Sequence, residues 1–133
     1  MLEIMPADSK ELQLRACSLL TADYLTECAA YYAKRGERIL ALCQFTVSDK
    51  AADIRSLNVA NAPILEAERT ARLLIFGVLS FLDACGVSYV RYLADSALGI
   101  PDKMQGFKRN DDGIYYTEID GFFDCSTSED QTK

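Results

Sequence analysis

The sequence contains no histidine and no tryptophan among its 133 residues. Histidine is the side chain that most often exchanges protons near neutral pH, and it commonly activates nucleophiles or ligates metals. Its absence excludes His-based general acid–base chemistry, Ser–His and Cys–His nucleophile pairs, and His-ligated metal sites. This is the strongest exclusion that the sequence offers.

The chain also lacks a paired cysteine motif. Its five cysteines are odd in number and widely spaced, and no two form a CxxC pair, so neither a disulfide framework nor a zinc site is indicated. We interpret them as reduced thiols and expect no metal site. They are Cys17, Cys28, Cys43, Cys85 and Cys125.

Long apolar runs and excess positive charge are missing as well. The uncharged run from Leu73 to Leu82 is far shorter than the roughly 20 residues that cross a membrane. The N-terminus has no basic stretch followed by an apolar one. The net charge of −6 disfavours nucleic acids and anionic membranes as partners. We therefore predict a cytoplasmic protein.

What is present is the composition of one folded domain, with half of the residues hydrophobic. We place this domain at residues 1–124. Residues 125–133 are predicted to be a disordered tail, because the terminal STSEDQTK lacks apolar side chains. The sequence leaves open whether Phe122 and Phe123 pack internally or against a partner.

A helix predicted over Glu66–Cys85 is the central element. Its middle carries no charge, so we expect neighbouring elements to cover most of its faces. Glu66 and Glu68 suit the positive end of the helix dipole, and Gly86 is a typical stop residue.

The segments before this helix predict an edge strand, two helices and a hairpin. The edge strand is 2–5, and Asp8 with Glu11 has the spacing of a capping box for a helix to about Leu20. Thr21 is the predicted N-cap of a second helix through Tyr32 that ends at Gly36. The strands 38–47 and 51–60, joined by the turn 48–50, form the predicted antiparallel hairpin.

Two strands are expected after the helix. Residues 88–93 alternate in character, and the preceding long helix favours a parallel crossover from the strand 51–60. Residues 95–105 have room for only a short helix or a loop. Asn110 to Gly113 is a strong turn signal before the strand 114–119.

The start of the central helix is the first candidate site. The first amides of a helix have no internal acceptor, so a loop followed by a helix start can bind an anion. Arg69 and Arg72 lie where the helix dipole disfavours cations, and a bound phosphate would explain them. The alternative is a surface ion pair between Glu68 and Arg72.

In its order of elements the chain resembles the GNAT superfamily of acyl-CoA-dependent N-acetyltransferases. The resemblance covers most of the chain and implies an α/β (α+β) fold with a mixed, largely antiparallel sheet flanked by helices. It implies a strand end at Val59, a loop proline at Pro63, and acetyl-CoA as the cofactor. The implied cofactor-binding residues are Val59, Arg69, Thr70, Ala71 and Arg72.

The family motif R/Q-x-x-G-x-G/A, which cradles the CoA pyrophosphate, falls on Glu66–Ala71. Ala71 fits the motif. Glu66 stands where the family has a basic or amide residue, and Arg69 replaces a glycine that lets phosphate approach the backbone.

A later family segment, N-x-x-A followed by Y-x-x-x-G-F, has a counterpart in spacing. Gly106 and Phe107 match it, as does Ala97. Asp95 replaces the asparagine, and Asp102 replaces the tyrosine that protonates the departing CoA thiolate. An ionised Asp is a poor proton donor, so no catalytic residue can be named.

Other polar residues have a structural and a catalytic interpretation. A carboxylate facing a cleft could act as a base, whereas an exposed strand charge needs no such role; this applies to Asp53, Glu118 and Asp120. The tyrosines at 89, 92, 115 and 116 are typical packing residues with a hydrated hydroxyl.

Two functions follow from the resemblance. The first is transfer of an acetyl group from acetyl-CoA to a primary amine on a small molecule or peptide. The second is a non-catalytic binding or dimerising module, a homodimer for example, that has lost CoA chemistry. Glu66, Arg69 and Asp102 favour the second, while Pro63, Ala71 and the Gly106-Phe107 pair favour the first.

Overall fold

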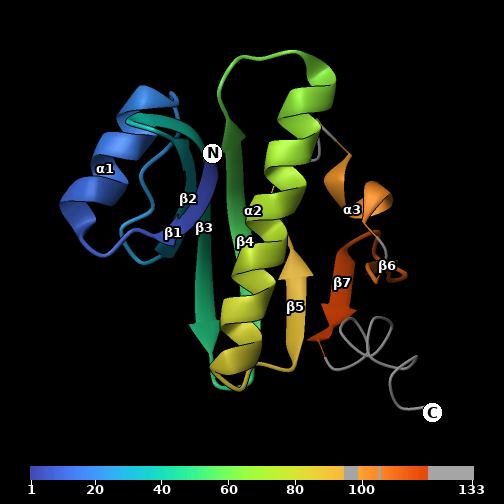
Figure 1. Cartoon of the computed structure of the whole chain (residues 1–133). Helices are drawn as coiled ribbons and strands as arrows, with labels where there is room; N and C mark the ends of the chain where they lie inside the picture. The colour runs from blue at the N-terminus through green and yellow to red at the C-terminus, as the bar shows by residue number, and fades with distance from the viewer. Residues whose placement is uncertain (95–98, 105, 120–133) are drawn as a thin grey trace, which may run out of the picture.

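Seven strands form one mixed sheet in the computed structural model, which describes residues 1–94, 99–104 and 106–119 (Figure 1). Their order across the sheet is β1-β2-β3-β4-β5-β7-β6, and only β4 and β5 run parallel. The strands are β1 (Leu2–Pro6), β2 (Ala29–Arg35), β3 (Arg38–Ser48), β4 (Ala51–Val59), β5 (Tyr89–Tyr92), β6 (Lys108–Arg109) and β7 (Tyr115–Glu118). The predicted mixed, largely antiparallel sheet is confirmed.

Helices cover the two faces of this sheet at different places. They are α1 (Lys10–Leu19), α2 (Ile64–Ala84) and the short α3 (Ile100–Lys103). Leu42 packs in the cluster under α1, whereas its neighbour Cys43 packs in the larger cluster under α2. Because successive residues of a strand point to opposite faces, α1 and α2 lie on opposite sides of β3.

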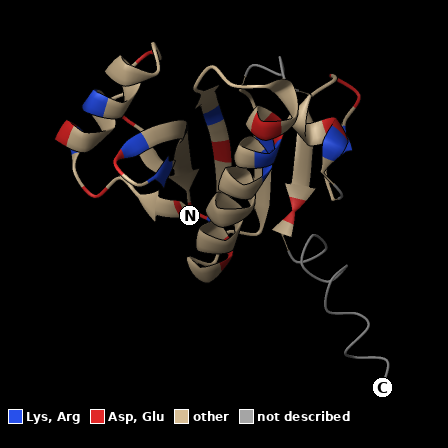
Figure 2. Cartoon of the chain, turned by 45° about the horizontal axis from the view of Figure 1, so that its top comes forward, with Lys and Arg blue, Asp and Glu red and all other residues tan. Residues whose placement is uncertain are grey.

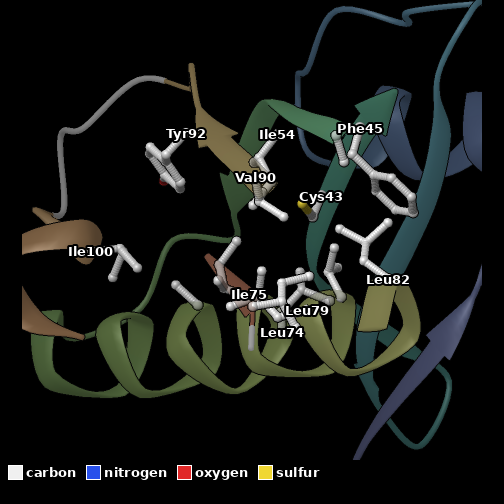
Figure 3. Packing of buried hydrophobic residues seen from close by; sticks show 14 of the residues in the cluster. Cys43, Phe45, Ile54, Leu74, Ile75, Leu79, Leu82, Val90, Tyr92 and Ile100 are labelled. Atoms are coloured by element: carbon white, nitrogen blue, oxygen red, sulfur yellow. The ribbon is translucent and has the colours of Figure 1, made fainter. Parts of the chain in front are cut away.

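The main core lies between α2 and the strands β3, β4 and β5 (Figure 3). The side chains of Leu74, Leu79 and Leu82 point from the helix toward the sheet and are fully buried. The helix begins two residues earlier than predicted, at Ile64. The side of α2 that packs on the sheet explains the apolar residues in the middle of this helix.

The expectation that α2 is covered on most faces is wrong. Leu73 and Phe76 remain 42% and 48% exposed on its outer side, since the sheet covers only one face. A charge-free helix segment therefore does not need burial all round, because isolated apolar side chains are common on protein surfaces.

The second early helix is also a wrong prediction, because its C-terminal half is strand β2. Tyr31 packs with Phe81 of α2 at a ring distance of 5.2 Å, while Tyr32 packs on the α1 side. This period-two alternation favours a strand. Gly36, at a φ of 61°, turns the chain into β3.

A buried glutamine holds the segment between α1 and β2. The Gln44 amide on β3 donates to the Asp23 carbonyl (2.8 Å) and the Ser56 hydroxyl (2.9 Å). Its oxygen accepts from the Gln13 side chain (2.8 Å) and the Leu25 backbone N–H (3.0 Å). Residues 20–28 thus obtain buried hydrogen-bond partners without forming a helix.

Several smaller predictions are settled. The β3–β4 hairpin, the parallel β4–β5 pair and the turn at Asn110–Gly113 are confirmed. The cap of α1 is Ser9, whose hydroxyl accepts from the Leu12 N–H, and not Asp8. Four of the cysteines are free thiols, as expected.

Some expectations fall on residues outside the described ones. These are the proposals for Asp95, Ala97, Asp120, Phe122, Phe123, Cys125 and the tail 125–133. Among the described residues, no helix is both long and apolar enough to cross a membrane.

Gly77 of α2 packs closely against Ile4 of β1. A Cβ added there would lie 2.7 Å from Ile4 Cγ2. Gly→Ala in a helix interior usually stabilises by about 0.5–1 kcal/mol. Here we expect Gly77→Ala to lower the free energy of unfolding by about 1–3 kcal/mol, because overpacking outweighs helix propensity.

Urea denaturation of a double-mutant series tests this assignment. Gly77→Ala should become stabilising in an Ile4→Ala background, which removes Cγ2. It should stay destabilising in an Ile4→Val background, which keeps Cγ2. Equal effects in both backgrounds would contradict the proposed contact.

Candidate functional site

β4 and β5 separate halfway along β4. Their parallel register runs from Ala51 opposite Tyr89 to Ile54 opposite Tyr92, and the last bond is from the Leu93 N–H to the Ile54 carbonyl (2.8 Å). Beyond Ile54, β4 continues to Val59 while pairing with β3 on its other side (Figure 1). Within the described part of the chain, the β5-facing edge of residues 55–59 has no strand neighbour.

A β-bulge accounts for this separation. Phe45 of β3 lies opposite Ile54, but the preceding residue Gln44 lies opposite Ser56, so Arg55 is an extra residue on β4. A bulge bends its strand and increases the local twist. It therefore turns the second half of β4 away from the line of β5.

An open cleft of about 350 Å³ occupies the resulting gap. The end of β4, the following loop, the start of α2 and the end of β5 form its walls. The lining residues are Leu57, Asn58, Val59, Ala60, Asn61, Ala62, Ile64, Ala67, Tyr92 and Ile100. The cleft therefore runs from the strand edge to the N-terminus of the long helix.

The N-terminus of α2 offers unpaired backbone donors. Pro63 is the N-cap residue, and no side chain caps the helix. The first internal bond runs from the Ala67 N–H to the Pro63 carbonyl (2.9 Å). The amides of Ile64, Leu65 and Glu66 thus have no acceptor inside the helix and lie at its positive end.

The structure brings only some of the predicted cofactor residues together. Val59 lines the cleft, and Thr70 lines an adjoining cavity. Ala71 is fully buried in the core, while Arg69 and Arg72 are exposed and form no ion pair with any described residue. The amides of residues 69–71 lie inside the helix and are not free. The free amides are those of residues 64–66, about one turn before the residues that the family motif indicates.

The acidic residues at the helix start pair with other elements. Glu66 accepts from Arg35 of β2 (3.3 Å), and Glu68 pairs with Lys103 of α3. The alternative prediction of a Glu68–Arg72 pair is therefore wrong. Figure 2 shows acidic and basic residues together at the start of α2.

Tyr92 is the one titratable side chain among the described residues that line the cleft. It is 4% exposed and packs edge-on against Phe107 at a ring distance of 6.1 Å. The sequence predicts a packing tyrosine, and the structure shows that this packing residue also borders the cleft. Nothing in the sequence around Tyr92 indicates that it borders a cleft.

A phenol also lies beside Asp102, the position where the resemblance places a tyrosine. Tyr115 of β7 donates a hydrogen bond of 2.6 Å to Asp102 Oδ1, and Arg109 lies 5.5 Å above the Tyr115 ring. The hydrogen bond to the carboxylate raises the pKa of Tyr115 above its ordinary value near 10, and desolvation adds to this. Sequence spacing could not reveal this cross-element pair.

Asp53 is engaged on the opposite face of the sheet. Both of its oxygens accept from Arg91, at 2.8 and 2.9 Å. The hydrogen bond to Asp53 raises the pKa of Arg91. A carboxylate in a bidentate ion pair is a weak candidate for a base. Glu118, at the end of β7, is exposed and lines none of the cavities described.

No family model matches the chain, and no curated protein matches its sequence. Solved structures do match. The ribosomal-protein-S18-alanine N-acetyltransferase from Escherichia coli has a TM-score of 0.64 at 14% identity, covering 90% of this chain and 94% of its own. YhhK from E. coli, solved with bound coenzyme A, has a TM-score of 0.62 at 19% identity, covering 89% and 98%.

A GNAT-family structure from Desulfovibrio desulfuricans has a TM-score of 0.60 at 13% identity, covering 90% of this chain and 99% of its own. At such identities the likeness is one of fold. The predicted GNAT-type fold is therefore confirmed.

The Tyr115–Asp102 pair has a measurable titration. We expect the pKa of Tyr115 to lie above 10 and to fall toward that value in Asp102→Asn, because the charged acceptor is lost. Absorbance titration near 295 nm, with Tyr115→Phe as the blank, measures it. Since the folded-state pKa is raised, the stability from this pair is present below pH 10 and lost as pH rises through the folded-state value. An unchanged pKa in Asp102→Asn would contradict the pair.

Proposed function

We propose that the chain is a GNAT-type N-acyltransferase that moves an acetyl group from acetyl-CoA to a primary amine. The observation that carries this proposal is the opening between β4 and β5, which leads directly to the free amides of α2. The fold shared with solved acetyltransferases, one of them bound to coenzyme A, supports it.

The walls of the cleft fit the two ends of a CoA molecule. The free edge of β4 at 55–59 offers backbone donors and acceptors to an extended chain carrying amides, as an added strand would use them. The amides of Ile64–Glu66 would hold a negative phosphate at the helix N-terminus. The small side chains of Ala60 and Ala62 keep the loop between these two regions narrow.

The chemistry needs little from the protein beyond positioning and one proton. Bound acyl-CoA supplies an activated thioester carbonyl, which an unprotonated amine attacks as the carbon–sulfur bond breaks. The amine loses a proton and the leaving thiolate gains one. Tyr92 lines the cleft with its hydroxyl buried, and it is our candidate donor in place of the family tyrosine that Asp102 replaces.

One observation favours the second function, a binding module without CoA chemistry. The Glu66 carboxylate lies in the first turn of α2, next to the amides that would hold phosphate, and it already pairs with Arg35. A fixed negative charge there weakens anion binding. This alternative predicts that the cleft binds no acyl-CoA.

Calorimetry with acetyl-CoA separates the two functions. We expect wild-type protein to bind in the micromolar range, which corresponds to about −8 kcal/mol. Ile64→Trp should weaken binding at least tenfold, because Ile64 lines the cleft and is 59% exposed, so a larger side chain narrows the cleft without disturbing the core.

Two further variants sharpen this experiment. Ser80→Trp is the matched bulky control on the exposed side of α2 and should bind as the wild type does. Arg69→Glu tests the motif alignment and should have only a small effect, because Arg69 does not line the cleft. No heat with millimolar acetyl-CoA would rule out the transferase and favour the binding module.

A further inference from the structure

The outer side of α2 carries several exposed apolar side chains. Leu65 is 77% exposed, Phe76 is 48% exposed and Leu73 is 42% exposed. In Figure 1 α2 lies in front of the sheet, and no other described element lies over its outer side. One such side chain is normal on a protein surface, but three on one side of one helix indicate an interaction surface.

Charged residues lie along the same side of the helix. Arg69 and Asp83 are seven residues before and after Phe76, so each lies about two turns from it and on nearly the same side. Leu65 and Arg72 continue this line in steps of three and four residues, the spacing that presents side chains to a facing helix. We call Leu65, Arg69, Arg72, Phe76 and Asp83 the α2 seam.

The charges of the α2 seam are not matched within the chain. Arg69, Arg72 and Asp83 are exposed, and none of them forms an ion pair with a described residue. The last turn of α2 contains Asp83 and no basic residue. A helix dipole disfavours a carboxylate at the C-terminal end and a cation near the N-terminal end. Both signs therefore stand at the less favourable end of their own helix.

A second copy of α2, packed antiparallel about a two-fold axis at Phe76, matches these charges. Arg69 and Asp83 each lie about 10 Å from Phe76 along the helix. The axis therefore brings Arg69 of each chain beside Asp83 of the other, and every contact occurs twice. Each charge then lies at the end of the facing helix whose dipole favours it. A parallel arrangement would instead place like charges together.

We propose that two copies of this chain form a homodimer in which the α2 seams pack antiparallel around Phe76. The contact face is about 30 Å long and about 10 Å wide. It is smaller than the roughly 800 Å² per partner of a standard interface, so we expect a weak, reversible dimer. No residue of the α2 seam lines the cleft, and the proposal holds whether or not the chain transfers acyl groups.

Sedimentation equilibrium with charge-reversal variants tests this dimer. The mass of the wild type should rise with concentration from 14.8 kDa toward twice that value. Arg69→Glu and Asp83→Arg should each weaken dimerisation at least tenfold, because like charges then face each other. The double variant Arg69→Glu/Asp83→Arg should return to within about threefold of the wild type, since opposite charges face each other again.

Recovery in the double variant identifies an antiparallel contact between chains. Positions 69 and 83 lie about 21 Å apart along one helix, too far to interact within a chain. Arg15→Glu is the matched control, because it makes the same charge change at an exposed position of α1, on the other side of the sheet, and should leave the dimer unchanged.

Three results would overturn the proposal. They are a chain that stays monomeric up to about 1 mM, equal losses in Arg15→Glu and Arg69→Glu, and a double variant that dimerises as weakly as the single variants. Acetyl-CoA binding should stay close to that of the wild type in all these variants, since none of the changed residues lines the cleft. A failure of the dimer is therefore distinguishable from a failure of the proposed function.

Discussion

The bend of β4 at Arg55 is the constraint on which the other features of this molecule depend. Before the bulge, β4 pairs on both sides and its side chains complete the core under α2. After it, β4 pairs with β3, and its second edge has no strand neighbour among the described residues. Gln44 secures this bend, because its amide bonds Ser56 directly after the bulge and also ties down the segment between α1 and β2. A buried polar network on one face of the sheet thereby positions a cleft between two of its strands.

Charge at the start of α2 decides how that cleft can be used. The helix presents free amides, but its own first turns carry both signs, and each glutamate is paired with a cation from another element. The positive charge that faces the helix end comes from the β2–β3 hairpin and not from the helix. The groups that could bind an anion are therefore divided between the backbone at the start of α2 and side chains of the β2–β3 hairpin, which a contiguous sequence motif does not describe.

The order of elements was largely predictable, because hydrophobic period and turn residues are local signals. The β3–β4 hairpin, the long helix and the parallel strand after it follow directly from such patterns. The structure of residues 21–32 could not be predicted, because Tyr31 and Tyr32 suit a helix and a strand alike. Only the pairing of β2 with β1 and β3 decides between the two. The placement of the candidate site at the start of α2 stays a prediction from the sequence, and its geometry could not be predicted. The bulge depends on one extra residue in a register. The approach of the β2–β3 hairpin to the start of α2 and the Tyr115–Asp102 pair each bring together separate elements.

The loop between β4 and α2 is a common wall of the cleft and of the adjoining cavity that Thr70 lines, since Ala60, Asn61 and Ala62 border both. Ligands bound in the two cavities would both contact this loop, so the affinity for one would depend on whether the other is bound. Any shift of the loop that improves the fit of one occupant changes the affinity of the other, and the factor is the same in both directions. The three loop residues Ala60, Asn61 and Ala62 would then be enough to make the occupancy of one cavity affect the other.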